Sequence, residues 1–179
     1  ENAPWLTKEE FDRALAAATG RLKDFLLICY YTGARRRSIE RMTKAQVDLA
    51  RGRINLTSPA ETALQRASKK RRPIVPIDPK IRPTVERLMM EGPENPWLLG
   101  SDADRYRDFN NLMRSVGLAD KGNPHILRHS RATHLLHAGV SIFDVAKLLG
   151  DTVATVERVY GHHCPDYLGE AIRDRQTGA

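Results

Sequence analysis

Residues 141–160 have the sequence SIFDVAKLLGDTVATVERVY, which predicts two short helices that end at a tyrosine. Ser141 is a favourable N-cap for the first helix, and Gly150 suits the left-handed conformation that ends many helices. Thr152 is placed to cap a second helix that leads to Tyr160. The pair is also typical of a helix-turn-helix, in which the N-terminal residues of the second helix contact base edges in the major groove of DNA.

Upstream of this stretch, the sequence predicts two further helices. Residues 7–10 form a capping box, so a helix is expected from about residue 8 to Thr19, with Gly20 as its stop. Apolar residues then recur at helical spacing over 22–30, and Gly33 suits a C-terminal cap. Arg35 is therefore expected to follow directly on a rigid, buried element.

The middle of the chain predicts a small sheet, and the rest predicts helices. Residues 46–56 have the pattern of strand, turn and strand, and 73–77 supply a third short apolar strand. Helical patterns cover 79–91, 102–116 and 124–138, and a last amphipathic helix is expected from Pro165. The helix over 102–116 is expected to bury Tyr106, Phe109, Leu112, Met113 and Val116. The predicted fold class is α+β, mainly α-helical with a small three-stranded antiparallel sheet.

Length and composition predict one soluble domain over residues 1–179. The hydrophobic share of 41% is enough for one sizeable core. The longest apolar run covers only 25–31, whereas a membrane-spanning helix needs about 20 apolar residues. Cys29 and Cys164 are too few for a disulfide framework, so a reducing, cytoplasmic setting is expected, with no membrane partner.

The positive charge of the chain is concentrated in one region. The formal net charge is +7, and residues 35–72 contain twelve Lys and Arg against three acids. This region carries +9, so the rest of the chain carries −2. A solvated basic face would explain such a run, but a phosphate-binding surface is favoured. The charge alone does not name the polyanion.

Four kinds of side chain in this sequence suit the cleavage of a phosphodiester. Arg35 and Arg128 come from different predicted helices, and arginine binds phosphate oxygens through paired hydrogen bonds. The Tyr160 phenol is a nucleophile that needs a base, because the ordinary pKa of tyrosine is about 10. His125 shares a helix face with Arg128 and is placed to accept that proton. A lysine whose pKa is lowered by neighbouring arginines would protonate the leaving 5′ oxygen.

The order of these residues resembles the catalytic domain of the tyrosine recombinases, the phage integrase family. Family members have an arginine in a Thr-Gly-x-Arg turn, which corresponds to Arg35, and then a lysine on a β-hairpin. His-x-x-Arg follows, which corresponds to His125 and Arg128. A Leu-Gly-His or similar element comes next, with the nucleophilic tyrosine nine positions later, and here Asp151 precedes Tyr160 by nine. The resemblance spans nearly the whole chain.

Two residues depart from the family pattern, and the hairpin spacing differs by about one residue. Asp151 stands where the family commonly has histidine or tryptophan. A carboxylate there would repel phosphate unless it pairs with an arginine. Ser38 stands where many members have an acidic residue.

The resemblance implies that DNA is cleaved and rejoined through a 3′-phosphotyrosyl link at Tyr160, with release of a 5′ hydroxyl and without metal, ATP or another cofactor. Arg35 and Arg128 would hold the phosphate, and His125 would assist proton transfer. Lys69 would protonate the leaving oxygen, with Lys70 as the competing choice. Further basic residues are expected to contact the DNA: Arg36, Arg37, Lys70, Arg71, Arg72 and Arg131.

The resemblance also implies partners. These are double-stranded DNA and three further copies of the chain, which form a tetramer on two DNA sites through the helix near 165–173. The free protein is expected to be a monomer. The N-terminal domain that grips the opposite face of the duplex is expected to be absent from this chain, so DNA binding is expected to be weak. Two other functions stay open: a helix-turn-helix regulator and a type IB topoisomerase-like strand cutter.

The remaining histidines are expected to have no catalytic role. His162, His163 and Cys164 are consecutive and cannot easily converge on one ion. His134 and His137 lie three apart on one predicted helix without a carboxylate motif beside them. No metal site is predicted.

Overall fold

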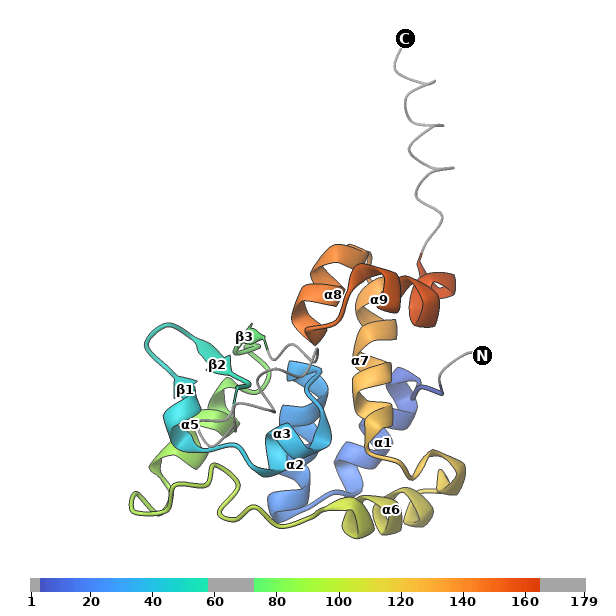
Figure 1. Cartoon of the computed structure of the whole chain (residues 1–179). Coiled ribbons are helices and arrows are strands. Elements are labelled where there is room, and N and C mark those ends of the chain that lie inside the picture. Colours follow the sequence, from blue (N-terminus) through green and yellow to red (C-terminus); the bar gives the residue numbers. More distant parts are fainter. Residues whose placement is uncertain (1–3, 58–72, 165–179) are drawn as a thin grey trace.

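The computed structural model describes residues 4–57 and 73–164, which form a mainly helical structure with one small sheet (Figure 1). The predicted fold class is confirmed. The α-helices are α1 (Lys8–Ala17), α2 (Gly20–Thr32), α3 (Arg36–Glu40), α5 (Arg82–Met90), α6 (Tyr106–Ser115), α7 (His125–His137), α8 (Ile142–Leu149) and α9 (Val153–Tyr160). The 3-10 turns are η1 (Lys44–Gln46), η2 (Ala119–Lys121) and η3 (Gly161–His163), and the strands are β1 (Val47–Asp48), β2 (Arg53–Asn55) and β3 (Ile74–Pro76).

The first two helices follow the local signals of the sequence with two corrections. The predicted capping box is present, because Thr7 and Glu10 each accept a hydrogen bond from the other's backbone amide. Helix α1, however, ends at Ala17 rather than Thr19, because Ala18 adopts an extended conformation. Gly20 does not stop α1 but is the first residue of α2, with φ at +52°.

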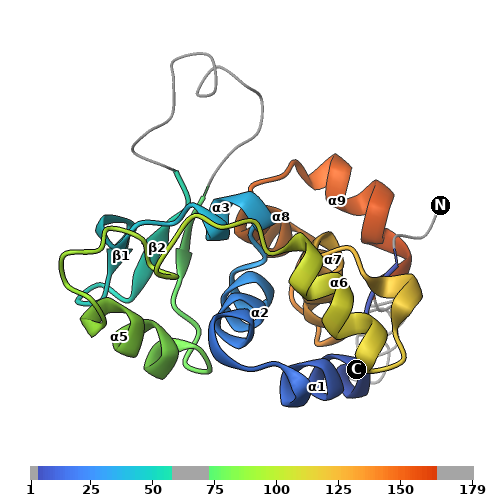
Figure 2. The same ribbon diagram turned by 90° about the horizontal axis from the view of Figure 1, so that it is seen from below.

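The three strands form an antiparallel sheet in the order β1-β2-β3. Ile54 in the central strand pairs with Val47 on one side and Val75 on the other. Ile54 and Val75 are buried while their chain neighbours are exposed, so one face of the sheet covers the core. The sheet and α5 lie on one side of α2, and α6, α7 and α9 lie on the other (Figure 2).

Two hydrophobic clusters make up the core, and α7 belongs to both. The larger cluster draws on α1, α2, the sheet, α5 and α6, and it includes Ile126 and Leu127 from the start of α7. The smaller cluster combines the second half of α7 with α8 and α9, and it includes Tyr160. Helix α7 therefore connects the end of α9 to the rest of the molecule.

The prediction that Tyr106 belongs to the core was wrong. Tyr106 was expected to be buried with Phe109, but it lies in the first turn of α6 and is 44% exposed. The guanidinium of Arg36 lies 5.6 Å from the centroid of the Tyr106 ring. A cation over an aromatic face is favourable without burial of the ring, so helical spacing alone misassigned this position.

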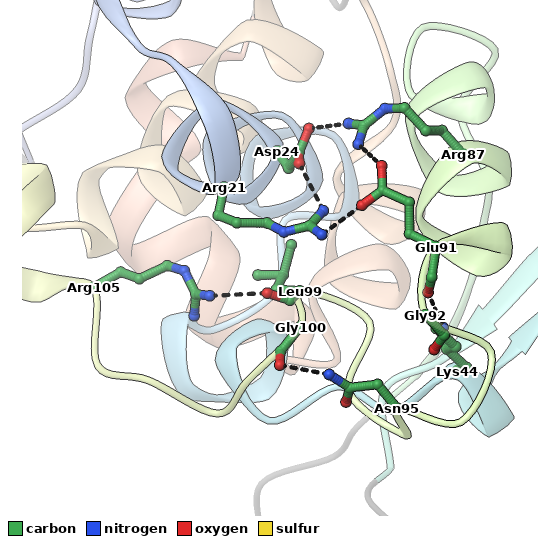
Figure 3. A network of polar contacts seen from close by, with 10 residues as sticks. All are labelled: Arg21, Asp24, Lys44, Arg87, Glu91, Gly92, Asn95, Leu99, Gly100 and Arg105. Carbon is green, nitrogen blue, oxygen red and sulfur yellow. Dashed lines mark hydrogen bonds and ion pairs between the residues drawn. The ribbon is translucent and has the colours of Figure 1, made fainter.

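A polar network ties α2 to α5, and separate hydrogen bonds hold the segment that precedes α6 (Figure 3). The buried Asp24 carboxylate lies 2.5 Å from Arg87 Nη2 and 3.4 Å from Arg21 Nη1. Arg21 and Arg87 both also pair with Glu91 at the end of α5. The network holds the sheet side of the molecule against α2, since buried carboxylates are stable only when they are paired. Along the part of the chain that the structure describes, no helix is long and apolar enough to cross a bilayer.

Candidate active site

Arg35 is held at the end of α2 by a turn that requires glycine. Gly33 has φ at +64°, and a Cβ atom there would lie 2.8 Å from Leu149 Cδ2. A larger residue would be strained at this positive φ, and its Cβ atom would crowd the buried Leu149 side chain. This close approach brings Arg35 to the C-terminal end of α8, where its Nη2 lies 3.0 Å from Asp151 Oδ1.

Arg128 on α7 is buried and links three segments. Its guanidinium donates to the carbonyl of Gly33 at 2.8 Å, to the carbonyl of Leu149 at 2.9 Å and to Asp151 Oδ2 at 2.5 Å. The two carbonyls belong to the ends of α2 and α8, which lack partners within their own helices. Burial lowers the pKa of Arg128, and the charge of Asp151 opposes that effect. Arginine still remains charged at neutral pH.

Asp151 bridges the two arginines. One carboxylate oxygen pairs with Arg35 and the other pairs with Arg128. The sequence analysis required Asp151 to pair with an arginine if the site is to bind phosphate. The structure meets this condition with two arginines. Carboxylate and phosphate are the anions that guanidinium groups bind through paired hydrogen bonds. The side chain of Asp151 therefore occupies the place where an arginine pair would bind a phosphate.

The Tyr160 hydroxyl lies 2.6 Å from the Nδ1 atom of His129. Tyr160 is 5% exposed, and burial raises its pKa to about 12, with Arg128 lowering it and Asp151 raising it further. Burial, together with the charges of His125 and Arg128, lowers the pKa of His129 to about 4. At neutral pH the phenol is therefore protonated and the imidazole is neutral, so the hydroxyl donates its hydrogen to Nδ1.

His129 was not identified from the sequence. His125, the predicted proton acceptor, packs edge-on against the His129 ring with the two centroids 4.6 Å apart. Desolvation, followed by the charges of Arg128 and Arg35, lowers the pKa of His125. The signal that could have revealed His129 is its position one turn after His125 and directly after Arg128.

The low pKa of His129 predicts acid-sensitive stability. The ordinary pKa of 6.5 applies to the unfolded chain and about 4 to the folded protein, so the unfolded chain binds more protons between these values. The free energy of unfolding should fall as the pH drops from about 6.5 towards 4. Urea unfolding across this range should show a shallower dependence for His129→Asn. An unchanged slope in that variant would contradict the prediction.

The other predicted site residues are only partly described. Lys69, Lys70, Arg71 and Arg72 lie outside the described residues, as does the helix expected from Pro165, and their roles stay predictions. The remaining predicted DNA contacts have acidic partners: Arg36 pairs with Glu40 and Asp104, Arg37 pairs with Glu40, and Arg131 pairs with Asp78.

Three of the four remaining histidines gather around Trp5. The rings of His134, His137 and His163 each pack edge-on against the indole. Within 4–57 and 73–164, no three His, Cys, Asp or Glu side chains are placed to share a metal ion.

The model of the phage integrase family matches residues 4–166, nearly the whole chain. The chain belongs to this family. The resemblance found in the sequence is therefore confirmed.

Curated relatives include phage and cellular enzymes. The integrase of Escherichia phage P2 is 32% identical over 170 residues, which cover 94% of this chain and 45% of the relative. Tyrosine recombinase XerA of Thermococcus kodakarensis is 32% identical over 179 residues, which cover 93% of this chain and 60% of the relative. The chain thus spans about half the length of the curated relatives it matches.

Solved structures show the same fold. The catalytic domain of bacteriophage HP1 integrase superposes with a TM-score of 0.73 at 27% identity, covering 97% of this chain and 95% of that domain. The Tn1549 transposon integrase in complex with circular intermediate DNA gives a TM-score of 0.76, covering 98% of this chain and 68% of that one. Its 16% identity supports the fold alone.

Proposed function

We propose that this chain is the catalytic part of a site-specific DNA recombinase that cleaves and rejoins strands through a covalent bond between Tyr160 and DNA. The observation that carries the proposal is the meeting of Arg35, Arg128 and Tyr160 from three distant parts of the chain. Arg35 and Arg128 both pair with Asp151, and the charges of Arg128 and Asp151 act on the pKa of Tyr160, so the hydroxyl lies within electrostatic reach of Arg128 and Asp151. Membership of the phage integrase family supports the same conclusion.

In the proposed reaction, a DNA phosphate takes the place of the Asp151 carboxylate between the two guanidiniums. The arginines neutralise the non-bridging oxygens, on which charge accumulates in the transition state. The Tyr160 oxygen attacks phosphorus and the bond to the 5′ oxygen breaks. Lys69, or Lys70 in its place, gives a proton to that oxygen. The 5′ hydroxyl of a second strand then reverses the attack, so the phosphotyrosyl bond keeps the energy of the phosphodiester.

Double-stranded DNA is the proposed partner. Two solved relatives of this fold, XerH recombinase and the Tn1549 integrase, were determined with DNA. The basic region between Arg35 and Arg72 would provide phosphate contacts for this chain. We further propose that four copies assemble on two DNA sites through the segment that begins at Pro165, and that the free chain is a monomer.

Covalent capture tests the function. The protein is mixed with nicked duplexes of randomised sequence, in which the strand end beyond the nick diffuses away after cleavage and prevents rejoining. A recombinase leaves DNA attached to protein after SDS treatment, and the captured sequences then define its site. A helix-turn-helix regulator built on α8 and α9 would give only salt-sensitive binding. A topoisomerase-like cutter would relax supercoiled plasmid without exchanging strands.

Asp151 should weaken DNA binding, because its charge opposes that of the phosphate. The Asp151→Asn variant is expected to bind DNA about tenfold more tightly, a change of about 1.4 kcal/mol, which is modest for a like charge a few ångström from phosphate. Fluorescence anisotropy at one fixed salt concentration measures the effect. The control is Asp120→Asn on η2, which removes the same charge away from the arginines. Equal or weaker binding by Asp151→Asn would show that Asp151 mainly orients the guanidiniums.

A further inference from the structure

We propose that His129 is a catalytic residue, which takes the proton from the Tyr160 oxygen during strand cleavage and returns it during rejoining. The inference rests on the proposed function and replaces His125 as the acceptor of the phenol proton. It deepens that function by naming the group that acts on the nucleophile, a group outside the motifs that identified the family in the sequence.

The geometry places the ring of His129, rather than that of His125, in contact with the Tyr160 hydroxyl. Its Nδ1 atom lies 2.6 Å from the hydroxyl, within the distance required of a general base. Among the described residues, His129 is the hydrogen-bond partner of the Tyr160 hydroxyl. His129 directly follows Arg128 on α7, so one turn of this helix supplies both the phosphate ligand and the base.

The charge state of His129 in the protein without DNA suits a general base. His129 is uncharged at neutral pH, so Nδ1 has a free lone pair that can accept a proton. The positive charges of Arg128 and of a protonated His125 disfavour a charge on its ring. As the Tyr160 oxygen bonds to phosphorus, its O–H group becomes more acidic, so the transfer of the proton to Nδ1 is coupled to formation of that bond.

The proton transfer closes a cycle. As the Tyr160 oxygen bonds to phosphorus, its O–H bond breaks and a new N–H bond forms at His129 Nδ1. The bond from phosphorus to the 5′ oxygen breaks, and that oxygen takes a proton from the leaving-group acid. When a 5′ hydroxyl attacks the phosphotyrosine, its proton returns to that acid. The Tyr160 oxygen leaves phosphorus and recovers its proton from His129.

Two variants separate a base from a residue that only holds the phenol ring. In His129→Asn the amide oxygen lies near the former Nδ1 position and still accepts a hydrogen bond, but it is not basic. In His129→Ala the ring is removed, which leaves space that added imidazole can fill. The control is His137→Asn, which changes an exposed histidine on the same helix outside the site.

The rate of covalent capture in a single turnover is the measurement. We expect His129→Asn and His129→Ala to lose about 100-fold in rate while the control keeps the wild-type rate. We also expect added imidazole to restore the capture rate of His129→Ala, and more basic imidazoles to restore more of that rate. Wild-type rate in His129→Asn would overturn the inference, as would a folded His129→Ala that no imidazole restores. If wild-type protein itself captured no DNA, the proposed function would fail instead.

Discussion

The Tyr160→Phe variant is expected to capture no DNA covalently, a loss of at least about 10⁴-fold, because the substitution removes the attacking oxygen and nothing else. The phenyl ring keeps its place in the smaller hydrophobic cluster with Val156 and Leu149. One hydrogen bond to His129 is lost, which should cost about 1 kcal/mol of stability. DNA binding should be unchanged, since the arginines and the basic region remain.

A second tyrosine provides a matched control for this prediction. The Tyr30 hydroxyl lies 2.6 Å from Nδ1 of His134, which reproduces the contact between Tyr160 and His129 outside the site. Tyr30→Phe removes the same kind of bond from a buried ring, so both variants should have similar stability. Only Tyr160→Phe should lose capture of nicked DNA after SDS treatment. Capture at the wild-type level by Tyr160→Phe would assign the nucleophile to another residue.

Arg128 should give the second largest effect, on both catalysis and stability. Arg128→Lys keeps a positive charge but cannot donate to Gly33, Leu149 and Asp151 at the same time, because a single ammonium lacks the planar fork of guanidinium. We expect capture to fall about 10³-fold, as when one preorganised charge-stabilising group is removed. Arg128→Ala should also lower the free energy of unfolding by about 3 kcal/mol, because two buried carbonyls and a carboxylate lose a partner.

The two effects of Arg128 are measured separately. Urea unfolding gives the stability of each variant, and capture under conditions where all variants are folded gives the catalytic loss. The control is Arg114→Lys, an exposed position at the end of α6. If Arg128→Lys captured DNA at the wild-type rate, Arg128 would serve the fold alone and the phosphate would have to be held elsewhere.

The elements around Tyr160 were predicted because their signals are local. Ser141 accepts a hydrogen bond from the Asp144 amide and Gly150 adopts φ of +65°, as their residue types indicate. Thr152 accepts from the Thr155 amide and begins α9. Each of these contacts lies within four residues in sequence, so the chain needs no information from the rest of the fold to make them.

The errors arise where a distant segment decides the outcome. Tyr106 has the spacing of a core residue, but Arg36 covers its ring at the surface. For Asp151 the sequence left open whether an arginine pairs with it, because its two arginine partners are 116 and 23 residues away in sequence. Sequence spacing cannot show which charges meet when helices pack.

The sequence by itself determined the family, the fold class and four of the residues that meet at the site: Arg35, His125, Arg128 and Tyr160. It did so because motif spacing, helix caps and hydrophobic periodicity are local properties of the chain. The tertiary structure decided that His129 accepts a hydrogen bond from the Tyr160 hydroxyl and that Asp151 lies between the two arginines. These contacts depend on α7 packing against the ends of α2, α8 and α9, which only the complete core fixes.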